Sequence, residues 1–234
     1  MPTNPPVNQS TNQPIIQISL DVTTIDEAME LAHAAVRAGV DWLEAGTPLI
    51  LAEGLRCVQA MRATFPTVPI VADLKTMDGA GLEAEMMFRA GANMTVVMGQ
   101  AHDASIIEQV KMAKRYGGQV MCDVMLCPDK PRRAREAQEL GVDYIIVHTG
   151  FDERNMIHGL SPLDDLPAVL DAVTIPVQAV GGLTVEQAIQ TLDMGAAIVV
   201  FGAPLVISGS AFKAASDNFE DVLRAIVGRV KGNA

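Results

Sequence analysis

A repeat of about fifty residues constrains the fold of this 234-residue chain more than any other feature. Four segments share one pattern, in which a glycine precedes a short apolar run: AGVDWLEAG, AGANMTVVMG, LGVDYIIVH and MGAAIVVFG. Their glycines, Gly39, Gly91, Gly141 and Gly195, are separated by 52, 50 and 54 residues. Because the period runs through the whole chain, it indicates an architecture of repeated units.

Each repeat predicts an α-helix followed by a buried strand. The glycine ends an amphipathic stretch such as DEAMELAHAAVRAG, where apolar residues recur every three or four positions. A glycine there suits the C-cap of a helix, because it adopts left-handed backbone angles at the least cost. The apolar run that follows is typical of a parallel strand buried on both faces.

A second set of apolar segments lies between these repeats: IIQISLD, VPIVADLK, GGQVMCDVM and TIPVQAVGG. Both sets together make eight strands separated by helices, which predicts an α/β fold, a single (β/α)8 TIM barrel over residues 15–234. The alternative is an open six-stranded sheet with a nucleotide site. The sequence contains no Gly-x-Gly-x-x-Gly or P-loop motif in support of it.

Composition and charge narrow the possible functions. Apolar residues make up 49% of the chain, which excludes disorder for most of it. The 28 acidic residues outnumber the 17 basic ones, and a net charge of −11 speaks against binding to nucleic acid. No apolar run approaches the length of a membrane span, and three cysteines favour a reducing cytoplasm. Residues 1–14 are polar and uncharged, so we expect a flexible arm.

Charged side chains follow the predicted strands at their carboxyl ends, where barrel enzymes hold their active sites. These residues are Asp21, Glu44, Asp73, Lys75, Asp123 and His148. Asp73 and Lys75 are two apart on one strand, so we expect them to share a face, where the lysine would stabilise a developing oxyanion. Asp78 lies past that strand and can turn back or reach a neighbouring subunit. The alternative is an ordinary ion pair at a strand end.

Two of these carboxylates suggest a metal site, and the histidine suggests a base. Glu44 and Asp73 lie on adjacent strands and offer the two hard oxygen ligands that proteins usually give Mg²⁺. His148 ends the strand YIIVH and is positioned for general base chemistry.

Glycine pairs follow the last two predicted strands, in VGGLT and FGAPL. Gly181, Gly182, Gly202 and Ala203 offer backbone N–H groups to an anion, and barrels often hold phosphate between these two loops. We therefore expect a phosphate site there. The alternative is that these glycines only form tight turns.

The segments SLD, LEAGTP, EGLR, ADLKTMDGAG, DYIIVHTGFD and VGGL closely resemble the 3-hexulose-6-phosphate synthase family of the orotidine 5′-phosphate decarboxylase superfamily. The resemblance runs from about Ile16 to Ser210. It implies a homodimer of barrels, Mg²⁺, and an enediolate intermediate. The reaction it implies joins ribulose 5-phosphate to formaldehyde, reversibly.

The resemblance also implies a role for each candidate residue. Glu44 and Asp73 match metal ligands, Lys75 matches the residue that stabilises the enediolate, and His148 matches the acid/base residue. Asp78 matches an acid that enters the partner subunit's site. The remaining matches are to substrate contacts: Asp21, which positions His148 or the substrate, Asp123, and the phosphate-binding backbone of Gly182 and Gly202.

Two other functions stay open. The 3-keto-L-gulonate-6-phosphate decarboxylases share Glu44 but have Glu, Arg and Thr at the positions of Asp123, Phe151 and Val180. Orotidine decarboxylases carry a lysine in place of Glu44 and use no metal, so that activity is discounted. A non-catalytic barrel that binds a sugar phosphate is the second possibility.

The phosphate-binding segment departs from the family pattern. Ala203 and Pro204 stand where relatives have Gly-Gly or Gly-Arg.

Overall fold

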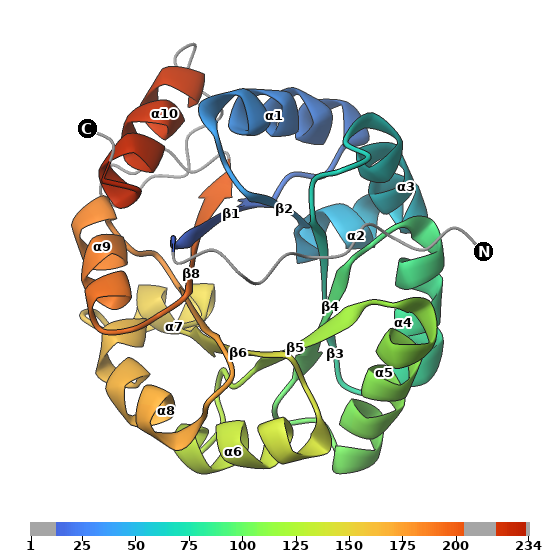
Figure 1. The fold of residues 1–234 in the computed structure, drawn as a ribbon, viewed down its shortest axis with the longest axis vertical. Helices are drawn as coiled ribbons and strands as arrows, with labels where there is room; N and C mark the ends of the chain where they lie inside the picture. Colours follow the sequence, from blue (N-terminus) through green and yellow to red (C-terminus); the bar gives the residue numbers. More distant parts are fainter. Residues whose placement is uncertain (1–12, 204–218, 233–234) are drawn as a thin grey trace.

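The computed structural model describes residues 13–203 and 219–232, and the predicted (β/α)8 barrel is confirmed (Figure 1). Eight parallel strands each pair with the next, and β1 pairs with β8 from Ile15 and Ile198 to Leu20 and Ala203. This closure makes the open-sheet alternative wrong. The strands are β1 (Ile15–Leu20), β2 (Trp42–Ala45), β3 (Ile70–Thr76), β4 (Met94–Met98), β5 (Gln119–Asp123), β6 (Tyr144–His148), β7 (Val177–Val180) and β8 (Ile198–Ala203).

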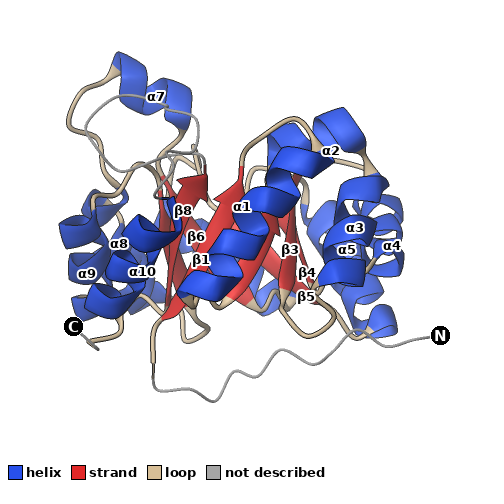
Figure 2. Ribbon diagram, turned by 90° about the horizontal axis from the view of Figure 1, so that it is seen from above, coloured by secondary structure: helices blue, strands red, loops and turns tan. Residues whose placement is uncertain are grey.

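Helices surround the barrel as an outer ring. This ring comprises α1 (Ile25–Ala38), α3 (Leu55–Thr64), α4 (Ala80–Ala90), α5 (Asp103–Tyr116), α6 (Lys130–Leu140), α8 (Leu166–Ala172), α9 (Val185–Asp193) and α10 (Phe219–Val230). Shorter elements follow β2 and β6: α2 (Thr47–Glu53), α7 (Phe151–Met156) and the 3-10 turn Pro162–Asp164. Figure 2 shows α7 standing beyond the ring, at the end of the barrel where the strands finish.

The repeated glycines have the conformation that the sequence predicts. Gly39, Gly91 and Gly141 end α1, α4 and α6 with φ of 94°, 117° and 99°. Gly195 lies just past α9 with φ of 115°. In this left-handed region a side chain would be strained, so the repeat in the sequence is a repeat of helix ends.

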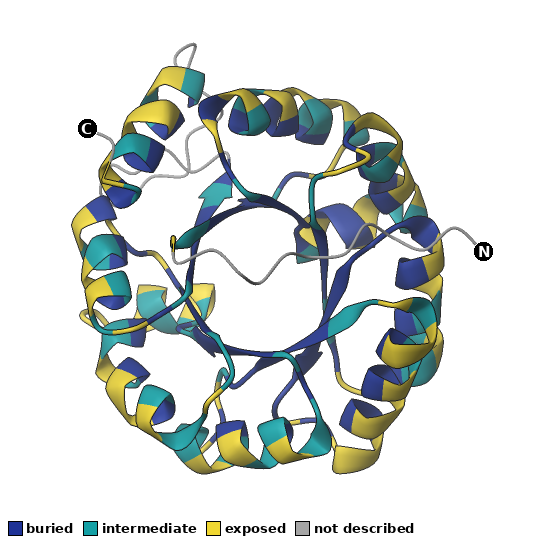
Figure 3. Cartoon of the chain, in the orientation of Figure 1, coloured by how far each residue is buried: buried dark blue, intermediate teal, exposed yellow. Residues whose placement is uncertain are grey.

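Strand side chains divide between two apolar regions. Those pointing outward pack beneath the helices, whose outer faces are exposed (Figure 3). Those pointing inward fill the barrel, and the buried ones are Trp42, Val71, Met94, Val96, Met121, Tyr144, Ile146 and Ile198. Because these side chains fill the barrel interior, we expect substrate to bind at the carboxyl ends of the strands.

Residues 1–12 of the predicted N-terminal arm lie outside the described residues, as does Pro204. Within the described part, no helix has both the length and the apolar character needed to cross a membrane.

Candidate active site

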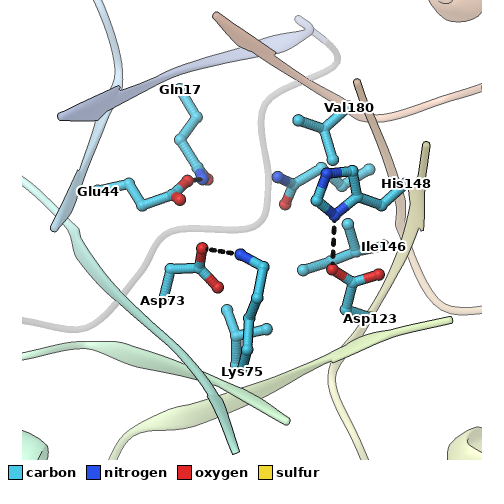
Figure 4. Close-up of a pocket in the computed structure, with 10 residues that line it drawn as sticks. Gln17, Glu44, Asp73, Lys75, Asp123, Ile146, His148 and Val180 are labelled. Atoms are coloured by element: carbon cyan, nitrogen blue, oxygen red, sulfur yellow. Dashed lines mark hydrogen bonds and ion pairs between the residues drawn. The ribbon is translucent and has the colours of Figure 1, made fainter. Parts of the chain in front are cut away.

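A small recess with a cavity volume of about 30 Å³ opens among the strands at their carboxyl ends. It is lined by Gln17, Glu44, Asp73, Lys75, Val96, Asp123, Ile146, His148, Gln178 and Val180. Figure 4 shows Glu44 and Asp73 on one wall, His148 and Asp123 on the opposite wall, and Lys75 between them. Five of the predicted site residues therefore share one pocket, although they come from four different strands.

Glu44 is a buried carboxylate, with 7% of its surface exposed. Ser19 donates a hydrogen bond to its Oε1 at 2.9 Å, and the Gln17 amide donates to its Oε2. Burial, reinforced by the charges of Asp73 and Asp21, raises the pKa of Glu44 to about 8. Crowded carboxylates of this kind favour a bound cation or a bound proton.

Asp73 and Lys75 form a close ion pair. Thr47 also donates to Asp73 Oδ2, at 2.9 Å. Burial acts to lower the pKa of Lys75, but the charge and hydrogen bond of Asp73, with the charge of Glu44, raise it above its ordinary value. Lys75 is therefore a fixed cation facing the pocket.

The backbone around Lys75 is less regular than the sequence predicts. The strand pairing shifts between Ala72 and Thr76, which pair with Thr95 and Val97. Lys75 has φ of 48°, in the left-handed region that costs a non-glycine residue free energy. The expected meeting of Asp73 and Lys75 is confirmed, but on a bulged strand end.

His148 is held by Asp123. Its Nδ1 lies 2.7 Å from Asp123 Oδ2, and Asp123 Oδ1 accepts a hydrogen bond from the Met125 N–H at 2.8 Å. A carboxylate only accepts hydrogen bonds, so this contact favours a proton on Nδ1 and leaves Nε2 available to the pocket. Asp123 therefore orients His148, and it also lines the pocket, where the resemblance implies a substrate contact.

Asp21 lies beside the pocket without lining it. Its Oδ1 lies 3.1 Å from the Ser19 hydroxyl, which lies between Asp21 and Glu44 and can donate to one of the two acids at a time. Burial raises the pKa of Asp21, and the charge of Asp73 adds to the rise. A Cβ on Gly46 would lie 2.3 Å from Asp21 Oδ1, which explains the glycine in the segment LEAGTP.

Asp78 is exposed on the loop after β3 and does not line the pocket of its own subunit.

The four predicted phosphate-binding residues lie on the rim of the pocket, at the ends of β7 and β8. Gly181 and Gly182 follow β7 with φ of 131° and 68°, and Gly202 and Ala203 end β8. The Ala203 side chain is buried, and its carbonyl accepts from the Asp21 N–H at 2.9 Å.

Several residues near the site are absent from the sequence-based predictions. Gln17 and Gln178 are buried uncharged side chains inside the barrel, and Arg154 lies on α7 against Gly182. A polar residue in an otherwise apolar strand, as in IIQISL and VQAV, is a signal for the two glutamines. For Arg154 the sequence has no comparable signal, because its place depends on how α7 packs.

The sequence pattern of the orotidine 5′-phosphate decarboxylase / HUMPS family matches residues 14–226. The chain belongs to this family. Within the family, the 3-hexulose-6-phosphate synthase of Mycobacterium gastri is 36% identical over 204 residues, which cover 86% of this chain and 95% of that protein. The predicted resemblance is confirmed.

Solved structures agree with this assignment. A crystal structure of 3-hexulose-6-phosphate synthase has a TM-score of 0.79 at 35% identity, and covers 91% of this chain and 99% of its own. The 3-keto-L-gulonate-6-phosphate decarboxylase of Vibrio cholerae has a TM-score of 0.77 at 25% identity, and covers 94% and 98%. The synthases are thus more similar to this chain in sequence, and both kinds of protein share its fold.

Proposed function

We propose that this protein is a Mg²⁺-dependent aldehyde-lyase that condenses formaldehyde with D-ribulose 5-phosphate, reversibly. The observation that carries the proposal is the pairing of His148 with Asp123 across the pocket from Lys75. A base and an oxyanion-stabilising cation facing one pocket suit enediolate chemistry. The name 3-hexulose-6-phosphate synthase, carried by the similar proteins, supports this reaction.

In the proposed mechanism His148 acts first as a base and then as an acid. Its Nε2 takes a proton from the carbon next to the substrate carbonyl, and the electron pair of that C–H bond moves onto the carbonyl oxygen. The Lys75 ammonium stabilises the resulting enediolate. The carbanionic carbon then attacks formaldehyde, and the new alkoxide takes the proton back from the imidazolium. Asp123 keeps the ring oriented throughout.

Glu44 and Asp73 are the proposed Mg²⁺ ligands. Their mutual repulsion, which contributes to the raised pKa of Glu44, is what a divalent cation would relieve. No set of three or more His, Cys, Asp or Glu side chains within the described ranges is arranged to hold a metal. Two carboxylates fit Mg²⁺, which keeps water and takes substrate oxygens. When bound, the ion supplies electrostatic stabilisation of negative charge on oxygen.

We also propose how the phosphate is bound, how the subunits assemble and where the protein acts. The backbone of Gly181, Gly182 and Gly202 binds the phosphate, and Asp21 contacts the sugar. The protein acts as a homodimer in which Asp78 enters the partner's site, a role that its exposed position leaves open. Three unpaired cysteine thiols support a cytoplasmic location.

A substrate screen tests the proposed reaction. Ketose phosphates are incubated with and without formaldehyde and Mg²⁺, and formaldehyde consumption and CO₂ release are both measured. We expect formaldehyde consumption with D-ribulose 5-phosphate that stops when EDTA removes the metal. Release of CO₂ from a β-keto sugar-acid phosphate would instead identify a decarboxylase. Calorimetric binding without turnover would identify a non-catalytic barrel.

A further inference from the structure

Arg154 of α7 covers the turn after β7. A Cβ on Gly182 would lie 1.9 Å from Arg154 Nη1, so the guanidinium lies directly against the Gly182 backbone. Two contacts hold it there. Its Nε donates to the Thr149 carbonyl at 3.2 Å, and its Cζ lies 5.7 Å from the centre of the Phe151 ring. The side chain is therefore oriented by the β6–α7 turn.

The charge of Arg154 is not neutralised within the described part of the chain. No described carboxylate lies within ion-pair distance of it, and its two Nη groups have no hydrogen-bond acceptor among the described residues. Arg62 is also partly buried without an ion pair, but its guanidinium donates to the carbonyls of Gly91, Phe65 and Val68. The Arg154 Nη groups are open to solvent, so an anion that binds at the rim can accept hydrogen bonds from both of them.

Arg154 lies beside the proposed phosphate site, where the backbone groups of the rim supply no full positive charge. Gly182 is exposed at the proposed phosphate site, and the neighbouring end of β8 offers Ala203, whose buried side chain supplies no cation. Backbone N–H groups alone would leave a phosphate dianion without a full positive charge beside it. A guanidinium supplies that charge and two parallel donors, which fit two phosphate oxygens.

We propose that Arg154 binds the phosphate of the substrate through its Nη groups and so makes the site specific for phosphorylated sugars. The inference rests on the proposed function, because it uses the phosphate site at Gly182. It adds a phosphate ligand from the α7 segment to the backbone groups of the last two strands.

The test compares Arg154→Gln with Arg154→Lys and a control, Arg56→Gln. Arg56 is an exposed arginine of α3 that pairs with Glu53, so this control removes one positive charge away from the site. Calorimetry measures the Kd for inorganic phosphate, and kinetics give KM and kcat for D-ribulose 5-phosphate. Inhibition by unphosphorylated D-ribulose serves as a second probe.

We expect Arg154→Gln to raise the phosphate Kd and the KM by roughly tenfold or more, since it removes charge-assisted hydrogen bonds. The kcat and the D-ribulose inhibition should stay within about twofold of wild type, since neither depends on the phosphate contact. Arg154→Lys should fall between wild type and Arg154→Gln, and Arg56→Gln should match wild type.

An unchanged phosphate Kd and KM in folded Arg154→Gln, judged by circular dichroism, would overturn the inference. If Arg154→Gln does not fold, wild-type values in Arg154→Lys would overturn it, because a lysine lacks the two parallel donors. A third outcome is that the wild type shows no aldolase turnover but binds phosphate, and that Arg154→Gln loses this binding. It would support Arg154 as an anion ligand and reject only the proposed reaction.

Discussion

Buried charges in the pocket each have a specific neighbour that decides their chemistry. Burial and then the charges of Asp73 and Asp21 raise the pKa of Glu44, whereas Lys75 is paired with Asp73 and stays charged. His148 is oriented through its Nδ1 by Asp123. The same residue types on a helix surface would be solvated and would lack these properties.

Removing either member of the Asp73–Lys75 pair should stop turnover without unfolding the barrel. We expect Lys75→Ala and Asp73→Asn each to lower kcat by about 10² or more, as when a transition-state donor is lost. Steady-state kinetics measure the effect. Lys111→Ala, which removes an exposed lysine of α5, is the matched control. Full turnover by either pocket variant would exclude that residue from the mechanism.

Gln178 is only 2% exposed, and its side-chain oxygen has no hydrogen-bond partner among the described residues. An unsatisfied buried oxygen costs about 1–3 kcal/mol, so we expect Gln178→Leu to be as stable as wild type or more stable. Because Gln178 lines the pocket, the same variant should raise KM.

Gln109→Leu is the control for Gln178→Leu. Gln109 is also buried, and within the described ranges its side-chain oxygen has no partner either. It lies on α5 away from the pocket, and its amide donates to Thr95. Urea unfolding and KM are measured for both variants. A wild-type KM in Gln178→Leu would show that the Gln178 side-chain oxygen does not bind the substrate.

The turns after β6 and β7 are packed against each other, and this packing shapes the rim of the site. A Cβ on Gly181 would lie 2.5 Å from the Thr149 carbonyl oxygen and 2.9 Å from its nitrogen. Thr149 N–H in turn donates to the Val180 carbonyl at 3.2 Å. Since both groups are backbone, neither turn can move without disturbing the strand that precedes it.

We expect Gly181→Ala to lower the free energy of unfolding by roughly 3 kcal/mol or more, through strain at φ of 131° and a backbone clash. Gly79→Ala separates the two causes, because Gly79 has φ of 66° and open space around it. That control should cost only about 1 kcal/mol. Equal losses for the two variants in urea unfolding would mean that the clash contributes nothing.

All eight strands point the same way, so every strand end contributes to one face of the barrel. Asp78 extends past that face on an exposed loop, away from the pocket of its own subunit. If the protein acts as a homodimer with shared sites, two different inactive variants should complement each other.

Coexpressing Lys75→Ala and Asp78→Asn subunits tests this arrangement. In a mixed dimer the Asp78→Asn subunit keeps Lys75 and receives an intact Asp78 from its partner. We therefore expect a random mixture to recover about a quarter of the wild-type activity, since half of the dimers are mixed and each has one complete site. Activity no greater than that of the separate variants, in a mixture that is dimeric by gel filtration, would reject the shared site.

Much of this organisation could be predicted from the sequence. The glycine period and the apolar runs indicated eight strands. The charged residues at the ends of those runs indicated a set of neighbours: Glu44, Asp73, Lys75, Asp123 and His148. This works because parallel strands in a closed barrel all end on the same face, so position along a strand is enough to predict proximity.

Only the tertiary structure decided which of these side chains touch, and which others join them. Asp123 bonds His148, Lys75 lies on a bulge, and Arg154 lies against Gly182. These contacts depend on the backbone path beyond each strand end and on packing between segments far apart in the chain. Periodicity predicts which face a strand residue occupies, but it carries no information about the direction of a side chain in a turn.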